Sequence, residues 1–119
     1  MSYVDGFVVA VPTANEEAYR AMAERAGHVF LAHGASQVLE AWGDAVPEGK
    51  VTDFRKAVRA EPDETVVFSW IVWPTKAAHD AGMKAAMAEL KAVMAEMPFD
   101  GKRMIYGGFR TIVALGTMA

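Results

Sequence analysis

The stretch Thr65-Val66-Val67-Phe68-Ser69-Trp70-Ile71-Val72-Trp73, which ends at Pro74, decides how the rest of the chain is interpreted. Alternate side chains of a strand point to opposite faces of the sheet, and here both sets are largely apolar. One face carries Thr65, Val67, Ser69, Ile71 and Trp73, and the other carries Val66, Phe68, Trp70 and Val72. A strand with water on one side would alternate apolar with polar residues. We therefore expect this strand to lie inside a sheet that is covered on both faces.

The composition predicts one globular domain over residues 1–119. Hydrophobic residues make up 53% of the chain and charged residues 23%. A net charge of -3 offers no cationic surface for nucleic acid, and the absence of cysteine excludes disulfides and cysteine-bound metals. The N-terminus lacks the pattern of a signal peptide, and no apolar run approaches the ~20 residues of a membrane span. We expect a cytoplasmic protein without nucleic-acid or membrane partners.

Strands and helices are predicted to alternate along the chain. The expected strands cover 3–11, 36–46, 65–73 and 103–115, and the expected helices cover 15–33 and 75–96. Asn15 is a plausible N-cap, Gly34 suits a left-handed helix end, and Gly82 is expected to break or bend the second helix. The more polar stretch Asp53 to Arg59 is predicted as an additional strand that forms a hairpin with the opening stretch.

Two short segments repeat one pattern. Val11-Pro12-Thr13 and Trp73-Pro74-Thr75 each end an apolar strand and precede a helix. Because the order strand, helix, strand occurs twice, we predict an α+β fold with a ferredoxin-like split βαβ antiparallel sheet and two helices on one face. Its other face would form an apolar patch larger than monomers normally show. A second copy packed sheet against sheet would cover that patch, so we expect a homodimer.

Five ordered blocks of sequence are similar to a known family. They are YVDGF at 3–7, WGDAVP at 42–47, GKVTDFR at 49–55, ETVVFSWIVWP at 64–74 and MPFDGKRMIYGGF at 97–109. Together they resemble the YbaA-like bacterial family of unknown function. That family is similar in fold to the dimeric α+β barrels, which include small heme-degrading and antibiotic-biosynthesis monooxygenases. The resemblance implies a dimeric α+β barrel and supplies no established activity.

Residues that commonly carry catalysis form no motif here. His28 and His33 are five positions apart, which does not bring them to one helix face, so we expect no metal site. Heme ligation by one histidine, as in some barrel relatives, has no supporting motif, and we expect no cofactor. Ser69 is expected to be packed and hydrogen-bonded rather than reactive. The methionines of the second helix are interpreted as core packing, and Gly107-Gly108 as a place where an aromatic ring or backbone approaches closely.

Polar and aromatic residues on or near strands form the candidate ligand site. The residues predicted to line it are Trp42, Asp53, Arg55, Trp70, Arg103 and Tyr106. Asp5 shares a face with Phe7, and a buried aspartate could pair with Arg55 or Arg103. If these groups converge between sheet and helices, they would orient a small, partly apolar molecule. The alternative is structural: the tryptophans form core or dimer interface, and the Asp-Arg pairs fix turns.

Three functions remain open from the sequence. The first is a homodimer that binds a small, partly apolar ligand between sheet and helices. The second is a cofactor-independent monooxygenase or isomerase with an Asp or His base and an arginine clamp, which rests on fold analogy alone. The third is a structural or interaction subunit without a ligand.

Overall fold

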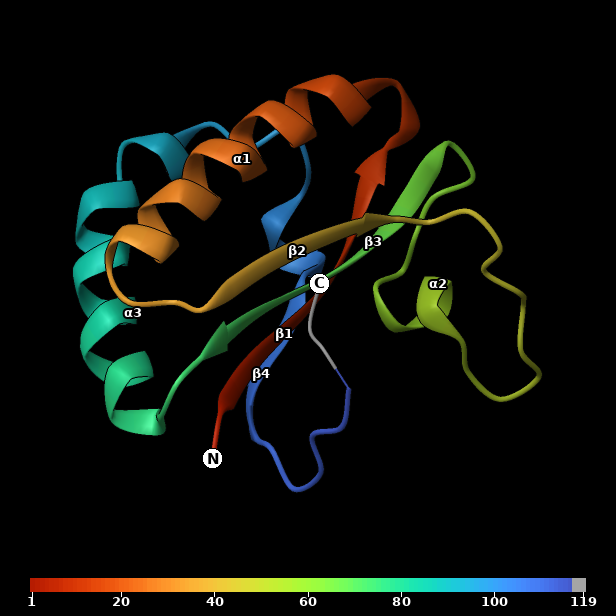
Figure 1. The fold of residues 1–119 in the computed structure, drawn as a ribbon. Coiled ribbons are helices and arrows are strands. Elements are labelled where there is room, and N and C mark those ends of the chain that lie inside the picture. The colour runs from red at the N-terminus through yellow and green to blue at the C-terminus, as the bar shows by residue number, and fades with distance from the viewer. Residues whose placement is uncertain (117–119) are drawn as a thin grey trace.

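A computed structural model describes residues 1–116 and contains a four-stranded antiparallel sheet in the order β2-β3-β1-β4 (Figure 1). The strands are β1 (Tyr3–Pro12), β2 (Gln37–Trp42), β3 (Glu64–Trp73) and β4 (Ile105–Arg110). The opening stretch is β3, which pairs with β1 from Glu64 to Trp73 and with β2 along its other edge. Its predicted place inside the sheet is confirmed.

Two long helices cover one face of this sheet. They are α1 (Glu16–Ala32) and α3 (Lys76–Leu90), and Figure 1 shows both on the same side of the strands. A carboxylate pair, Glu16 and Glu17, lies in the first turn of α1, where the helix dipole favours negative charge. The Thr75 hydroxyl caps α3 by accepting a hydrogen bond from the Ala78 amide at 3.0 Å. Gly34, at φ 108°, provides the predicted left-handed residue after α1.

Several element boundaries differ from the predictions. The second strand ends at Trp42 instead of 46, α3 ends at Leu90, and the last strand covers only Ile105–Arg110. Asn15 precedes α1 without capping it, because its side-chain amide donates to the Pro98 carbonyl at 2.9 Å. Gly82 does not interrupt α3. Its missing side chain makes room for the Trp73 indole and the His33 carbonyl, both of which a Cβ would overlap.

The prediction of a strand and hairpin at Asp53 to Arg59 is wrong. This stretch contains the short helix α2 (Phe54–Ala57), which Asp53 caps by accepting a hydrogen bond from the Lys56 amide at 2.6 Å. Burial explains the outcome. Val58 is only 1% exposed because it packs against the sheet face opposite α1 and α3, where it meets Ala10 and Val66. The segment therefore covers one end of that face instead of pairing with a strand.

The two faces of the sheet carry different side chains. On the side of α1 and α3, the helix face, β1 and β3 present Asp5, Phe7 and Val9 opposite Ile71, Ser69 and Val67. On the other side, the outer face, they present Val4, Gly6 and Val8 opposite Val72, Trp70 and Phe68. Trp73 thus faces the helices, and Trp70 faces outward. None of the helices formed by residues 1–116 has the length and apolar character that crossing a membrane requires.

Candidate functional site

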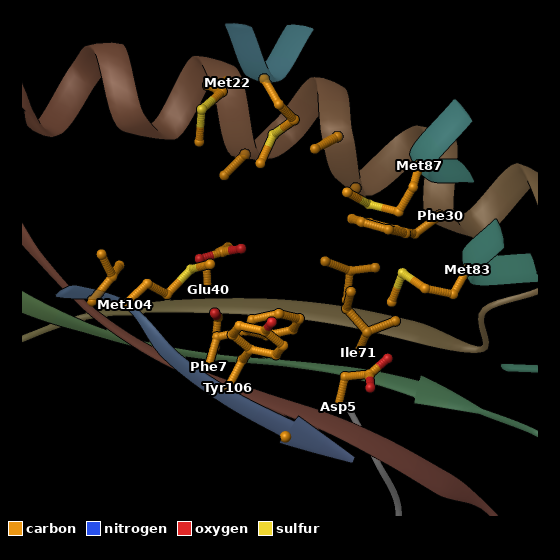
Figure 2. A pocket seen from close by; sticks show the side chains of 18 of the residues that line it. Asp5, Phe7, Met22, Phe30, Glu40, Ile71, Met83, Met87, Met104 and Tyr106 are labelled. Atoms are coloured by element: carbon orange, nitrogen blue, oxygen red, sulfur yellow. The ribbon is translucent and has the colours of Figure 1, made fainter. Parts of the chain in front are cut away.

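A cavity of about 600 Å³ lies between the sheet and the two long helices. Figure 2 shows side chains from both layers around it, among them Met22, Phe30, Met83, Met87, Phe7, Ile71 and Tyr106. Sites for small molecules commonly measure ~300–1,000 Å³ and are mostly apolar with a few polar groups. This cavity has that size and that kind of lining.

Small residues on α1 keep the space open. Ala23, Ala26 and Gly27 face the cavity and are buried, so the side of the helix that approaches the sheet carries little side-chain volume. Methionines from α3 and from the segment before β4 complete the wall. Their unbranched thioethers adapt to the shape of a neighbour more readily than branched side chains do. The methionine stripe therefore lines a cavity as well as packing the core.

Asp5 anchors the first polar group of the site. This residue is 7% exposed, and its Oδ2 accepts a hydrogen bond from Trp73 Nε1 at 3.0 Å. Its Oδ1 lies 3.0 Å from His79 Nε2, and His79 Nδ1 lies 2.8 Å from Asp80 Oδ1. Both ring nitrogens of His79 are therefore engaged, and neither can act as a base until one of these hydrogen bonds breaks.

The second polar group consists of Tyr19, Glu40 and Ser69. The Tyr19 hydroxyl donates to Glu40 Oε1 at 2.7 Å, and Ser69 lies directly opposite Glu40 on the neighbouring strand. Desolvation raises the pKa of the Glu40 carboxyl above its ordinary value, although hydrogen bonds from the Tyr19 and Ser69 hydroxyls oppose the rise. Burial, followed by the nearby Glu40 charge, raises the pKa of Tyr19 as well. Ser69, 5% exposed, is packed and hydrogen-bonded as expected.

Of the six predicted site residues, Tyr106 lines the cavity. Its ring stacks on Phe7 with 6.4 Å between centroids. Trp42 packs beside the cavity in the core cluster that contains Tyr19, and the two ring centroids are 6.3 Å apart. Trp70 lies on the outer face, where its Nε1 donates to Gln37 Oε1 at 3.0 Å. The structure brings Trp42 and Tyr106 to the same side of the sheet and separates Trp70 from them.

The remaining three predicted residues stabilise turns outside this cavity. Asp53 caps α2, and Arg55 donates to the carbonyls of Glu61 and Glu64 at 2.7 and 2.8 Å. Arg103 forms a two-point ion pair with Glu64, with both N···O distances at 2.7 Å, which holds the pKa of that carboxyl below its ordinary value. The buried Asp5 pairs with neither Arg55 nor Arg103, because Trp73 and His79 occupy its oxygens. The aspartate that does pair with Arg103 is the exposed Asp100, at 3.1 Å.

Of the polar residues that meet in the cavity, the sequence singled out Asp5 for its place beside Phe7, but Glu40 and His79 were not among the six predicted site residues. Glu40 carried a usable signal, since it lies between Val38 and Trp42 on one face of a strand, where an acidic side chain is out of place among apolar neighbours. His79 carried none, because its partner Asp5 is 74 positions away in the chain. Among residues 1–116, no three His, Asp or Glu side chains lie close enough together to hold a metal ion.

Comparison with known proteins places the chain in a family. A family profile described as "Protein of unknown function (DUF1428)" matches residues 2–101. The chain belongs to the DUF1428 family. "Uncharacterized protein YbaA" of Escherichia coli strain K12, which is 54% identical over 115 residues, covers 95% of this chain and 98% of its own length. The protein of the same name from Shigella flexneri gives the same values. The predicted YbaA-like membership is confirmed.

The DUF1428 match includes most of the cavity and stops before β4. It ends at residue 101, so Met104 and Tyr106 lie beyond it. Two solved structures overlap the chain loosely. The structure of Rv0793 from Mycobacterium tuberculosis gives a TM-score of 0.48 at 11% identity, over 98% of this chain and 100% of that one. The de novo designed protein Foldit4 gives 0.46 at 15% identity, over 96% and 100%. At these TM-scores neither likeness carries an inference about this member of DUF1428.

Proposed function

We propose that this DUF1428 protein is a single-domain, cytoplasmic homodimer of the dimeric α+β barrel type that binds a small, partly apolar molecule between its sheet and its helices. One observation carries the proposal. The cavity of about 600 Å³ is lined almost entirely by apolar side chains, and two polar groups, one at Asp5 and one at Glu40, face it. Such a lining binds an apolar body by desolvation and orients it through the few polar contacts.

The strand order supports the ferredoxin-like part of the proposal. Both β1 and β2 pair antiparallel with β3, so they run parallel to each other with β3 inserted between them. In the same way β3 and β4 run parallel with β1 between them. Each parallel pair is joined through a helix that packs on the same face, which is a split βαβ unit used twice.

Exposed apolar side chains on the outer face support the homodimer. Phe68 on β3 is 41% exposed, and Ile105 and Phe109 on β4 are 46% and 62% exposed, so the exposed rings and side chains lie on both sides of β1. The Phe109 ring lies over Gly6 and Gly107, where a Cβ at either glycine would be 3.6 or 3.4 Å from the ring. Burying such a surface removes apolar area from water, which stabilises by ~25 cal/mol per Å². A second copy related by a two-fold axis would cover the face with an identical one.

Ligand binding is tested with a neutral apolar fluorophore and a variant that fills the cavity. We expect N-phenyl-1-naphthylamine to bind the wild-type protein saturably, with one site per chain. Ala23→Phe should abolish this binding, because Ala23 is buried and faces the cavity. Ala21→Phe is the matched control on the exposed side of the same helix and should bind as the wild type does. Absence of saturable binding, or equal binding by the two variants, would overturn the proposal.

The Asp5–His79 contact favours one second candidate, an enzyme that uses no cofactor. A carboxylate 3.0 Å from an imidazole at the wall of an apolar cavity becomes an acid-base pair once the hydrogen bond between His79 and Asp80 opens. In this case His79→Gln should abolish turnover of activated phenolic substrates while the fluorophore still binds. Arg103→Ala should change stability alone, since Arg103 does not reach the cavity. If a stoichiometric protein partner is captured and no small molecule binds, a role as an interaction subunit replaces both the ligand-binding and the enzyme proposals.

A further inference from the structure

The charges that line the cavity are unevenly distributed. Two of the described lining residues are carboxylic acids, Asp5 and Glu40, and one is an imidazole, His79. Neither lysine nor arginine occurs among the lining residues that the structure describes. A site for phosphates or carboxylates is normally built with such cations, because they supply charge-assisted hydrogen bonds. The lining therefore does not suit an anion.

The two acids differ in what neutralises them. Asp5 uses one oxygen to accept from Trp73 and the other to contact His79, so protein groups occupy both. Glu40 meets neutral hydroxyl groups, with Tyr19 Oη at 2.7 Å. No lysine, arginine or histidine in the described part of the chain lies within ion-pair distance of Glu40. Glu40 is thus the acid in the cavity that no basic side chain of the described residues contacts.

The position of Glu40 lets it meet a ligand. Figure 2 shows its carboxyl group directed away from the sheet into the space below α1, and the residue remains exposed to solvent. Two aromatic rings surround Tyr19, the hydrogen-bond partner of Glu40. The centroid of the Tyr19 ring lies 5.6 Å from that of Phe99 and 6.3 Å from that of Trp42. Ring faces attract cations in addition to the attraction of a carboxylate. Both features favour a positively charged ligand group at this end of the cavity.

We infer that the cavity selects amines, with an apolar or aromatic body packed among the methionines and an ammonium group hydrogen-bonded to Glu40. This inference rests on the proposed function of the same cavity. A protonated amine restores to the Glu40 carboxylate the charge stabilisation that desolvation removes, and the low polarity of the lining strengthens the pair. A carboxylate ligand would instead meet a like charge and find no cation.

A matched set of three probes tests the selection. They are 4-phenylbutylamine, 4-phenylbutanol and 4-phenylbutanoate, which share one apolar body and differ in the charge of the end group. We expect the wild-type protein, titrated by calorimetry at pH 8 in low salt, to bind the amine at least about tenfold more tightly than the carboxylate, with the alcohol between them. Glu40→Gln should make the amine bind no more tightly than the alcohol. A glutamine can still accept the Tyr19 hydrogen bond, and a melting temperature at least as high as that of the wild type verifies folding.

A control variant and the remaining outcomes separate this inference from the proposal on which it rests. Glu24→Gln removes an exposed acid of α1 that does not line the cavity, and it should leave the order of the three affinities unchanged. If the alcohol binds as tightly as the amine, or if Glu40→Gln keeps the preference for the amine, amine selection is overturned and ligand binding stands. If none of the three probes and no neutral fluorophore binds, the cavity is not a ligand site and both statements fall.

Discussion

The two faces of β1 and β3 are both apolar, but the chain treats them differently. On the helix face, α1 and α3 close over the strands, and Trp73 is fully buried at 0% exposure. On the outer face, the segment around α2 covers the end near Val58, and Phe68 remains 41% exposed. The polar residues of the cavity also belong to one face, since Asp5, Glu40 and Ser69 all lie on the helix face. An apolar strand face becomes a core only where the chain also supplies its cover.

The largest expected effect distinguishes the two tryptophans of β3. Trp73→Ala should lower the free energy of unfolding by about 4 kcal/mol, because it empties a fully buried site and removes the hydrogen-bond donor of Asp5 Oδ2. Trp70→Ala on the outer face should cost less than about half of that, since Trp70 is partly exposed. Urea denaturation of both variants at one protein concentration measures the difference. Equal losses would show that the two faces are closed to the same extent.

A somewhat smaller loss of stability is expected at the end of the outer face that the α2 segment covers. Arg103 joins Glu64 of β3 to the Arg59 carbonyl, which ties the α2 segment to the sheet. Arg103→Met should cost about 3 kcal/mol at pH 7, because the Glu64 side chain, 6% exposed, loses its cation. The Glu64 pKa is lowered in the folded protein, so the pair stabilises fully above the ordinary carboxyl pKa. That stabilisation is lost as the pH falls through the lower folded value.

The pH dependence gives this prediction its control. Denaturation of wild type and Arg103→Met should differ at pH 7, and the difference should shrink as the pH falls through the lowered folded pKa of Glu64. The stability of Glu64→Gln should lack the pH-dependent contribution that the Glu64–Arg103 ion pair makes in wild type. A difference between wild type and Arg103→Met that is constant from pH 7 to pH 3 would mean that packing of the arginine, and not its charge, holds this end of the face.

The next prediction asks whether a second copy covers the open part of the outer face. Wild-type protein should sediment at about twice the 12.9 kDa of one chain. Phe109→Asp should sediment as a monomer, because it would bury a charge within the proposed interface. Leu31→Asp is the matched control and should remain a dimer. Leu31 is an exposed apolar residue like Phe109, at 45% and 62% exposure, but it lies on α1 and not on the outer face. A wild-type monomer at micromolar concentration would contradict the homodimer.

Local patterns in the sequence were sufficient to predict the sheet and its helices. The alternation in β3, the prolines after the two apolar strands and Gly34 after α1 each act within a few residues. The stretch Asp53 to Arg59 was mispredicted because its cationic side chains suit an edge strand as well as they suit a short exposed helix. What decides its structure is the burial of Val58 against Ala10 and Val66, which is a tertiary contact.

The candidate site depends even more on distant contacts. Glu40 meets Tyr19 across 21 positions, and Asp5 meets His79 across 74. Period-two alternation placed Trp42 and Tyr106 on strands, but it could not tell which face of the sheet the helices would cover. That choice follows from how α1 and α3 pack, and it separates Trp70 from the cavity.

The smallest expected effect concerns Glu40, the acid that the helix face leaves without a cation. Its pKa is raised by desolvation, so the folded state binds the proton more tightly than the unfolded state does. The contribution of this group to stability is therefore greatest below its ordinary pKa and decreases as the pH rises through the folded value. Glu40→Gln should be more stable than wild type at pH 8, by less than about 1 kcal/mol because Glu40 remains exposed to solvent, and should lose that advantage at pH 4. Thermal melts at both pH values measure the change, and Glu24→Gln should show neither effect. If the proposed amine binds here, saturating 4-phenylbutylamine should reverse the order at pH 8, since only the wild-type carboxylate gains a cation.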